Sequence, residues 1–238
     1  MTNREEKYGK RMYELLSKTP QTEIQESFTK YVRRQQMARF LAMHEIFLKV
    51  REVKGSIVDA GCYRGFSSFA WLQFMAAYCP YSYQDRVICF DSYEGFPEIG
   101  EKDTGVDNPE LKVGAFGDVD LDGQKKCAEL FQLNHPLYHL KKIEFVKGDI
   151  NVTVPRYIEN NQHLLIKLLY IDTDLFEPAK TLLVNLVPRM SRGSIIIFDE
   201  AGNSRWPGET MAMLEGFDLP NNRLECFSYE PNLSYMTL

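Results

Sequence analysis

Two short apolar stretches that each run into a pair of acidic residues constrain the fold of this chain more than any other feature. They are residues 168–174 and 194–200, which read LLYIDTD and SIIIFDE. Short, uninterrupted apolar runs are typical of strands buried on both faces, and the helix-like stretch 178–187 between them predicts a strand, a crossover helix and a second, parallel strand. Such crossovers are right-handed in nearly all cases, so both acidic ends are expected at the carboxyl edge of one sheet, where open α/β folds bind ligands.

The acidic residues at these two strand ends are expected to share a site. They are Asp172, Asp174, Asp199 and Glu200. Carboxylates held close together repel one another unless a cation or shared protons neutralise them, and hard oxygen ligands suit Mg²⁺ or another divalent ion. A strand-end aspartate can also simply cap the next helix, as Asp174 could do here. For two acidic pairs on neighbouring strands, the sequence favours a metal site over two caps.

A glycine-rich turn follows the first predicted strand. Residues 55–61 form a short apolar run that ends in Gly61, and Gly65 completes a G-x-x-x-G turn before a helix predicted over residues 66–77. Glycine lets the backbone approach a ligand closely, and the N-terminus of the helix offers free N–H groups to a carboxylate or a phosphate. The pattern differs from the G-x-G-x-x-G of dinucleotide folds, which argues against a nicotinamide cofactor.

Two further predicted strands also end in acids. Residues 86–90 lead into Asp91, and residues 143–148 lead into Asp149. An acid at the end of the second strand is well placed to accept hydrogen bonds from both hydroxyls of a ribose. Asp91 could equally open a turn with Ser92.

The order of these elements predicts an α/β fold in which helices cover both faces of a mainly parallel sheet. The last segments, residues 224–229 and 233–238, are expected to form an antiparallel hairpin joined by residues 230–232. Residues 1–53 are helical in character and are predicted to form an N-terminal extension that acts as a lid or in oligomerisation. Residues 54–238 are predicted to form the catalytic domain.

Composition narrows the class of protein. A chain of 238 residues that is 44% hydrophobic can form one substantial core, and its net charge of -5 argues against a main role in binding nucleic acid or anionic membranes. The five cysteines are scattered without a C-x-x-C spacing, so they suggest neither a disulfide framework nor a zinc knuckle. The N-terminal residues lack the apolar core of a signal peptide, and no apolar run is long enough to span a bilayer. We therefore expect a soluble, cytoplasmic protein.

Two segments at the predicted ligand-binding edge are expected to be loops. Residues 98–121 are rich in Gly, Asp and Pro and lack periodicity, as lids and binding loops often do. Residues 201–210 follow the second acidic pair directly, so Arg205, Trp206 and Glu209 are expected to border the site. Core packing and substrate contact are equally compatible with Trp206.

Four motifs together resemble the macrocin O-methyltransferase (TylF-like) family. They are residues 58–65, 90–97, 171–177 and 198–200, and the D-S-x-E-G-F-P stretch within the second is the most specific. The resemblance runs from about residue 28 to the C-terminus, and the loop at 205–210 resembles that of members acting on deoxysugars or sugar nucleotides. It implies the class I methyltransferase fold, which is Rossmann-like with a seven-stranded sheet, together with S-adenosylmethionine as methyl donor, Mg²⁺ dependence and methylation of a sugar hydroxyl.

Two positions depart from the family's pattern. Asp59 replaces the usual Glu at the end of the first strand, and Glu200 replaces the commoner second Asp of the later acidic pair. Both substitutions keep the charge.

The family's pattern also assigns roles to individual residues. Those expected to bind S-adenosylmethionine are Asp59, Gly61, Tyr63, Arg64, Gly65, Asp91, Ser92 and Asp149. The resemblance implies that Asp59 and the two glycines surround the methionine portion, that Asp91 holds the ribose and that Asp149 lies at the adenine end. The acceptor is expected to be a small-molecule sugar or sugar nucleotide, and family members often assemble through N-terminal helices, so a homo-oligomer is expected.

The acidic residues supply the chemistry that hydroxyl methylation needs. Asp172, Asp199 and Glu200 are assigned to the metal, and either Asp172 or Asp174 is expected to act as the base. A divalent ion on the acceptor oxygen would stabilise a developing alkoxide, and a nearby carboxylate could take the proton.

Two other classes of protein are compatible with part of the sequence. Asp172, Thr173 and Asp174 have the D-x-D form by which many glycosyltransferases hold a metal and a nucleotide sugar, but that reading leaves the glycine turn and Asp91 unexplained. A non-catalytic binding module on the same fold would leave the crowded acids without a role. Methyl transfer therefore explains the most features.

Overall fold

The computed structural model describes residues 3–238 and divides into two compact units, one ending at Leu41 and the other running from Ala42 to Leu238. Residues 1 and 2, which begin the predicted extension over 1–53, lie outside the described residues. The first unit contains α1 (Asn3–Leu16), α2 (Gln21–Glu26), the 3-10 turn η1 (Phe28–Lys30) and the start of α3 (Arg34–Val50). Helix α3 begins only at Arg34, because Thr29, Tyr31 and Val32 before it are β-branched or aromatic residues of low helix propensity.

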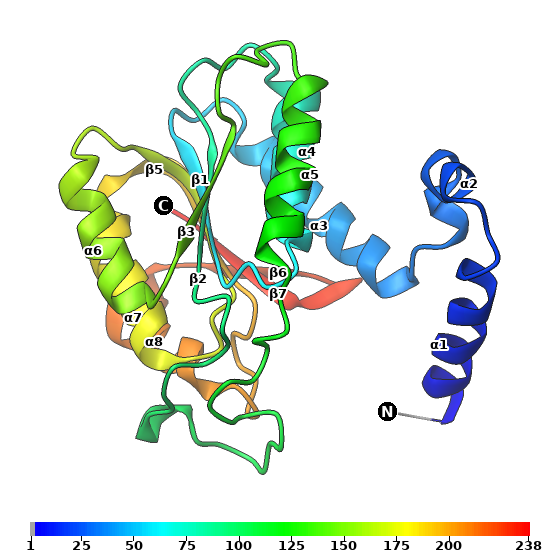
Figure 1. The fold of residues 1–238 in the computed structure, drawn as a ribbon. Coiled ribbons are helices and arrows are strands. Elements are labelled where there is room, and N and C mark those ends of the chain that lie inside the picture. Colours follow the sequence, from blue (N-terminus) through cyan, green and yellow to red (C-terminus); the bar gives the residue numbers. More distant parts are fainter. Residues whose placement is uncertain (1–2) are drawn as a thin grey trace. The chain divides into compact units, whose positions relative to one another are not determined.

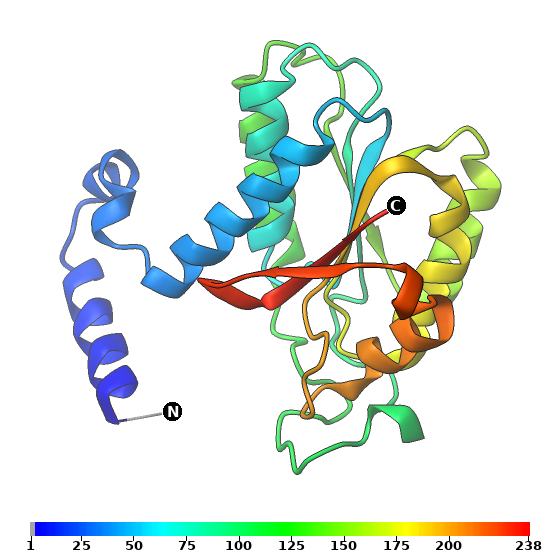
Figure 2. The same ribbon diagram turned by 180° about the vertical axis from the view of Figure 1, so that it is seen from behind.

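The second unit is built on a seven-stranded sheet of order β3-β2-β1-β4-β5-β7-β6. The strands are β1 (Ser56–Ala60), β2 (Val87–Asp91), β3 (Ile143–Lys147), β4 (Ile166–Ile171), β5 (Met190–Phe198), β6 (Leu224–Phe227) and β7 (Glu230–Thr237). Strands β1 to β5 are parallel, while β7 is antiparallel to both β5 and β6 (Figure 2). The predicted α/β class, with a mainly parallel sheet and a C-terminal antiparallel hairpin, is confirmed.

Helices cover both faces of this sheet, with α4 and α5 on one side and α6, α7 and α8 on the other (Figure 1). Their bounds are α4 (Phe66–Tyr78), α5 (Leu121–Leu133), α6 (Ile150–Asn160), α7 (Phe176–Leu186) and α8 (Pro207–Gly216), and the short 3-10 turns are η2 (Glu101–Asp103), η3 (Val187–Arg189) and η4 (Leu219–Asn221). None of the described helices is long and apolar enough to cross a bilayer.

Helix α6 has no counterpart in the sequence analysis. A proline inside a helix is disfavoured, and Pro155 lies within α6. The helix forms because Val154 and Tyr157 are buried against the sheet and because the Asp149 side chain accepts a hydrogen bond from the Asn151 N–H at its start.

The C-terminal hairpin turns earlier than predicted. Residues 230–232 were expected to form its turn, but Glu230 already begins β7, and the pairing between β6 and β7 shifts after Cys226. Pro231 is tolerated there because β7 pairs with β5 only from Ser234 onward, so its missing N–H removes no bond from that ladder.

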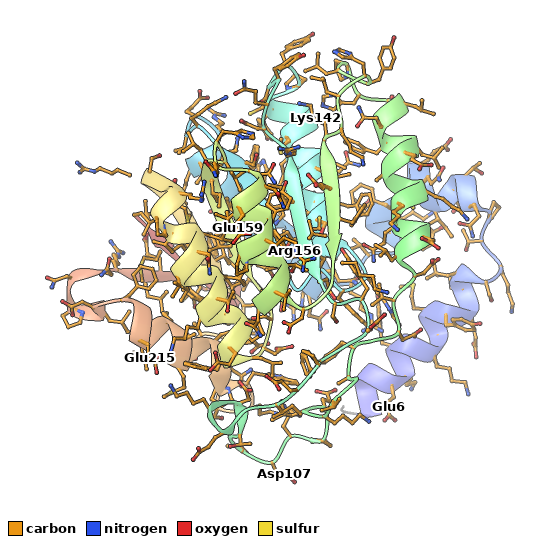
Figure 3. The ribbon with its side chains drawn as sticks, turned by 60° about the vertical axis from the view of Figure 1, so that its left-hand side comes forward. Glu6, Asp107, Lys142, Arg156, Glu159 and Glu215 are labelled. Carbon is orange, nitrogen blue, oxygen red and sulfur yellow. The ribbon has the colours of Figure 1, made fainter. Side chains whose placement is uncertain are left out.

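The two ends of the sheet differ in character. At the amino end, Lys167 is 1% exposed and its Nζ lies 3.2 Å from Asp85 Oδ2, and the Lys142 ammonium donates to nearby backbone carbonyls. Figure 3 shows Lys142 at this end and Asp107, in the long loop between β2 and α5, at the other. The carboxyl end, where that loop lies, carries all the acids singled out by the sequence.

Candidate active site

The acidic ends of β4 and β5 come together as predicted. Ile171 pairs with Phe198 in the sheet, so the residues that follow, Asp172 and Asp199, leave neighbouring strands side by side. Between them lies Tyr170, whose Oη is 2.9 Å from Asp199 Oδ1 and 3.3 Å from Asp172 Oδ2. The hydroxyl has one proton, so it can donate to one carboxylate at a time and couples the two acids.

A third acid, Glu209, ties the loops beyond these strands to each other. Its side chain is fully buried, Oε1 accepts hydrogen bonds from the N–H groups of Thr173 (2.7 Å) and Asp174 (2.9 Å), and Oε2 accepts one from the N–H of Glu200 (3.2 Å). Burial, together with the charges of Asp174 and Asp199, raises the pKa of Glu209 well above its usual value. The sequence analysis places Glu209 only at the border of the site. A glutamate in the first turn of a helix directly after the acidic pair was the available signal.

Asp174 lies in the loop after β4 with a φ of 61°, in the left-handed region. Burial raises the pKa of its carboxyl to about 8, and the neighbouring acids Glu200 and Asp199 add to the effect. The alternative that Asp174 caps α7 is wrong, because the N–H of Phe176 donates instead to Asp103 Oδ1 at 2.6 Å. The Asp174 side chain therefore does not cap α7 and belongs to the acidic cluster.

The cluster of Asp172, Asp174, Asp199 and Glu200 fits a hard cation by its chemistry. All its donors are carboxylate oxygens, the ligands that Mg²⁺ prefers. The pKa of Asp174 is raised by burial and, to a smaller extent, by repulsion from Glu200 and Asp199, and a cation would relieve that repulsion. The oxygens of Asp172 and Asp199 lie around the Tyr170 hydroxyl, and Glu200 accepts a hydrogen bond from the Asn203 amide. The side chains of Asp172, Asp199 and Glu200 would therefore have to rotate towards one another to bind one ion.

The glycine turn after β1 packs directly against this cluster. Gly61 has a φ of 83°, and a Cβ on it would lie 1.7 Å from the carbonyl oxygen of Asp172. Any side chain at this position would collide with the backbone of the β4 loop, so glycine is required. Gly65 also has a positive φ, 84°, at the start of α4. The glycine turn, which is expected to hold a ligand, thus lies next to the acidic cluster.

Asp91 connects β2 to the same turn. Its Oδ2 accepts a hydrogen bond from the N–H of Tyr63 at 2.8 Å, and its Oδ1 accepts one from the N–H of Tyr93 at 2.6 Å. Partial burial raises the pKa of Asp91, and these backbone donors act against the shift. The N–H of Cys62 also contacts this carboxylate, so three of its four lone-pair positions are used and one remains for a ligand hydroxyl.

The other residues expected to bind the donor have local partners at this edge. Arg64 forms an exposed ion pair with Asp118, at 3.0 Å, and Ser92 donates to the carbonyl of Gly95 at 2.7 Å. Asp149 caps α6. These contacts position the side chains in the loops after β1, β2 and β3, and their contacts with a donor stay a prediction.

Asp59 is turned away from any ligand at the surface of this edge. Its side chain is fully buried on β1 and accepts hydrogen bonds from Ser67, at 2.9 Å, and Ser68 at the start of α4. Burial raises the pKa of this carboxyl to about 7. Asp59 therefore fixes α4 to β1, and its expected place beside the methionine portion also stays a prediction.

Four aromatic residues pack together and connect the loops around the site. Trp206 is 7% exposed and lies 5.8 Å from Phe96 and 6.0 Å from Phe116 between ring centroids, and Tyr63 lies 5.8 Å from Phe116. These contacts join the glycine turn, the loop after β2 and the loop after β5. Trp206 thus packs among aromatic rings, the first of its two expected roles.

The loop over residues 98–121 is attached to the site by several contacts, among them two through polar side chains. Asp103 accepts the N–H of Phe176, as described, and Asn108 donates to the carbonyl of Arg205 at 3.0 Å. The Arg205 guanidinium in turn donates to the Asn108 side chain at 3.1 Å. These polar contacts hold the first part of the loop, and Phe116 packs its second part against the aromatic cluster. The predicted role of the loop as a lid remains a prediction.

Replacing Asp91 by alanine is expected to weaken S-adenosylmethionine binding by about tenfold or more, because hydrogen bonds to a charged acceptor are each worth ~1.5–3 kcal/mol. Asp91→Asn keeps one acceptor oxygen, so its affinity for S-adenosylmethionine should fall by less. Isothermal titration of each variant, with circular dichroism as a check on folding, measures the effect. Unchanged donor affinity in folded Asp91→Ala would refute the ribose assignment.

Comparison with known proteins places these features in a family. The family described as Macrocin-O-methyltransferase (TylF) matches residues 29–215. The chain is 29% identical over 150 residues to an enzyme of Streptomyces olivaceus, the 8-demethyl-8-(2,3-dimethoxy-alpha-L-rhamnosyl)-tetracenomycin-C 4'-O-methyltransferase. This match covers 62% of the chain and 53%, about half, of that relative.

Two of the similar solved structures cover the whole chain. The calicheamicin methyltransferase CalS11 has a TM-score of 0.94 at 29% identity, covering 100% of this chain and 93% of its own. An apo structure of CalS11, described as a TDP-rhamnose 3'-O-methyltransferase, has a TM-score of 0.85 at 28% identity, covering 100% and 95%. The O-methyltransferase NovP shares the fold, with a TM-score of 0.63 at 21% identity over 84% of this chain and 79% of its own. The chain belongs to the macrocin-O-methyltransferase (TylF) family.

Proposed function

We propose that this protein transfers a methyl group from S-adenosylmethionine to a hydroxyl of a sugar. The observation that carries the proposal is the contact between the glycine turn and the acidic cluster, in which Gly61 lies against the backbone of Asp172. Methyl transfer needs donor and acceptor oxygen held close and in line. A turn that binds the donor and acids that activate a hydroxyl, placed side by side, meet that need.

The chain's own residues have distinct tasks in this proposal. The turn at 61–65 and the N-terminus of α4 hold the carboxylate of the methionine portion, and Asp91 accepts from the ribose hydroxyls. Asp174 or Asp172 accepts the proton from the acceptor hydroxyl. The burial of Asp174 beside Glu200 and Asp199 supports it in this role, because a cation held by those neighbours would keep its carboxyl ionised and able to accept the proton.

Asp172, Asp199 and Glu200 would hold Mg²⁺. Bound there, the ion would supply positive charge that stabilises a developing alkoxide and lowers the mutual repulsion of the acids. Tyr170 supports the same arrangement by keeping Asp172 and Asp199 on either side of one hydroxyl.

The acceptor we propose is a 6-deoxyhexose of the rhamnose type. Two relatives support this class, one named for a rhamnosyl-tetracenomycin and one for TDP-rhamnose. Arg205, in the loop after the acidic pair, is half-exposed, and its guanidinium donates to the Asn108 side chain at 3.1 Å and makes a longer contact to Glu110, at 3.7 Å. A guanidinium so placed suits the diphosphate of a nucleotide sugar, which favours a nucleotide-linked acceptor over a finished glycoside.

The test is methylation of matched acceptors. TDP-rhamnose and a rhamnosyl glycoside are incubated with the enzyme, S-adenosylmethionine and Mg²⁺, and products are identified by the mass of one added methyl group. The proposal expects methylation of at least one acceptor and faster reaction of the nucleotide sugar. Methylation of the glycoside alone would refute the nucleotide-linked acceptor, and methylation of neither would refute the sugar class.

The glycosyltransferase alternative receives no support from family membership, since the matching family and the relatives named above are methyltransferases. Three further features remain proposals. They are the division into an extension over 1–53 and a catalytic domain over 54–238, the assembly into a homo-oligomer, and a cytoplasmic location. Gel filtration with light scattering addresses the oligomer directly.

A further inference from the structure

A buried group of sulfur and oxygen ligands lies beneath the glycine turn, separate from the acidic cluster. Asp59, on β1, is the sheet partner of Cys89, on β2, so their side chains share one face, and Cys62 follows in the turn. One potential ligand atom from each of the three lies within 4.8 Å of the other two. Among the described residues, this is the one such triad found, and the acids after β4 and β5 do not form another.

Two polar atoms at this place lack partners. Asp59 Oδ2 receives both serine hydroxyls, whereas Oδ1 is buried without a hydrogen bond to any described residue. The hydroxyl of Tyr93 is also buried without one, and it lies beside the thiols of Cys62 and Cys89. A buried polar atom with no partner costs ~1–3 kcal/mol, so a ligand that engages it would be stabilising.

The donor set identifies the chemical class of ligand. Two thiols select d¹⁰ cations such as Zn²⁺ over Mg²⁺, and one carboxylate oxygen completes three of the four positions of a tetrahedral site. Thiolates at ~2.3 Å from Zn²⁺ in a tetrahedron are ~3.8 Å apart, so ligand atoms now within 4.8 Å need to move inward by about 1 Å or less. The buried Tyr93 hydroxyl lies beside the two thiols, which makes it the candidate ligand for the fourth position.

We propose that Asp59, Cys62 and Cys89 form a site for Zn²⁺ or a similar thiolate-binding cation, with Tyr93 at its fourth position. On binding, the two S–H bonds break, the sulfur atoms keep the electron pairs for the metal, and the protons pass to water. Asp59 uses Oδ1, while Oδ2 keeps its bonds to α4. The ion would fasten the turn at 61–65 to β1 and β2, independently of whether the protein methylates a sugar.

Cadmium is the probe, because Cd²⁺ bound by thiolates absorbs in the ultraviolet. Titration of the unmodified chain with Cd²⁺ is expected to give a charge-transfer band that saturates at one ion per chain. Cys62→Ser and Cys89→Ser are each expected to weaken binding by ~100-fold or more, since even partners outside the ligand set change affinity 10–100-fold. The matched control is Cys127→Ser with Cys226→Ser, which removes two exposed thiols and should leave the band unchanged.

A second measurement covers the case in which the serine variants fail to fold. Zn²⁺ added to the unmodified chain should slow alkylation of Cys62 and Cys89, followed by peptide mass at a temperature where both react without metal. Equal alkylation with and without Zn²⁺ would overturn the proposal, as would a Cd²⁺ band that survives Cys62→Ser or disappears in the control. A purified chain lighter by two hydrogens, with these two cysteines linked, would show a disulfide in place of a metal site.

Discussion

Replacing Asp199 by asparagine is expected to lower the rate of methyl transfer by about 10²- to 10³-fold while S-adenosylmethionine still binds with nearly unchanged affinity. The amide keeps the shape of the side chain but removes a negative charge from the cluster, and removal of a single electrostatic contact to a developing oxyanion has an effect of this size in other enzymes. Asp199 is 4% exposed, and its Oδ1 lies 2.9 Å from the Tyr170 hydroxyl, so an isosteric change disturbs packing least. Asp172→Asn is expected to behave in the same way.

Three measurements separate a metal role from a structural one. Single-turnover rates with and without EDTA, followed by Mg²⁺ addition, should show loss and recovery in the unmodified enzyme. Both variants should need more Mg²⁺ for half-maximal rate, and titration of the donor should show little change. Asp122→Asn is the control, because Asp122 is an exposed acid on α5, paired only weakly with Lys125 at 3.4 Å. Full activity in the chelated enzyme or in Asp199→Asn would make the acids structural.

The position of the acids was predictable because it depends on local pattern and on one topological rule. The run over residues 194–198 is short and rich in β-branched isoleucine, which favours a buried strand over a helix. Right-handed crossover then brings its end beside Asp172. The glycine turn was predictable from local pattern as well, because glycines directly after a strand mark a turn. The structure shows why glycine is needed there, since Gly61 has a positive φ and no room for a side chain. The family resemblance, carried by the same motifs, is confirmed.

Contacts between distant segments were not predictable in this way. Nothing in the local sequence shows that Asp103 would cap α7, 73 residues later at Phe176, and the closer Asp174 was therefore considered for that task. Tyr170 is two residues before Asp172 and shares its side of β4, which strand alternation could have revealed. Helix α6 was missed because the energy of burying Val154 outweighs the local penalty of Pro155.

Replacing Glu209 by alanine is expected to be the most damaging single change near the site. The substitution would leave the N–H groups of Thr173, Asp174 and Glu200 without their acceptor, and each buried, unsatisfied group costs ~1–3 kcal/mol. The Thr173 N–H is buried and the other two are part-buried, so the total loss lies towards the lower end of ~3–9 kcal/mol, which is still a large share of the ~5–15 kcal/mol stability of a typical domain. We therefore expect a large drop in the midpoint of thermal unfolding, and little folded protein.

Glu209→Gln tests positioning rather than folding. The glutamine oxygen can still accept from Thr173 and Asp174, but its NH₂ group then faces the N–H of Glu200, so this one loop should shift. We expect folded protein whose donor affinity is unchanged, whose rate falls by about tenfold or more, and whose requirement for Mg²⁺ rises, because Glu200 is displaced relative to Asp172. A merely structural role would lower stability without changing the requirement for Mg²⁺.

The matched control for both variants is Glu215→Gln on the same helix, α8. Glu215 is exposed and pairs with Lys102 and with Lys180, at 3.1 Å, and exposed ion pairs contribute little to stability. Its replacement should therefore change neither the unfolding midpoint nor the rate by a measurable amount. If Glu209→Ala is as stable and as active as this control, the carboxylate does not hold the two acidic loops together. If Glu209→Gln loses stability but keeps the normal rate and Mg²⁺ requirement, Glu209 supports the fold without positioning the acids.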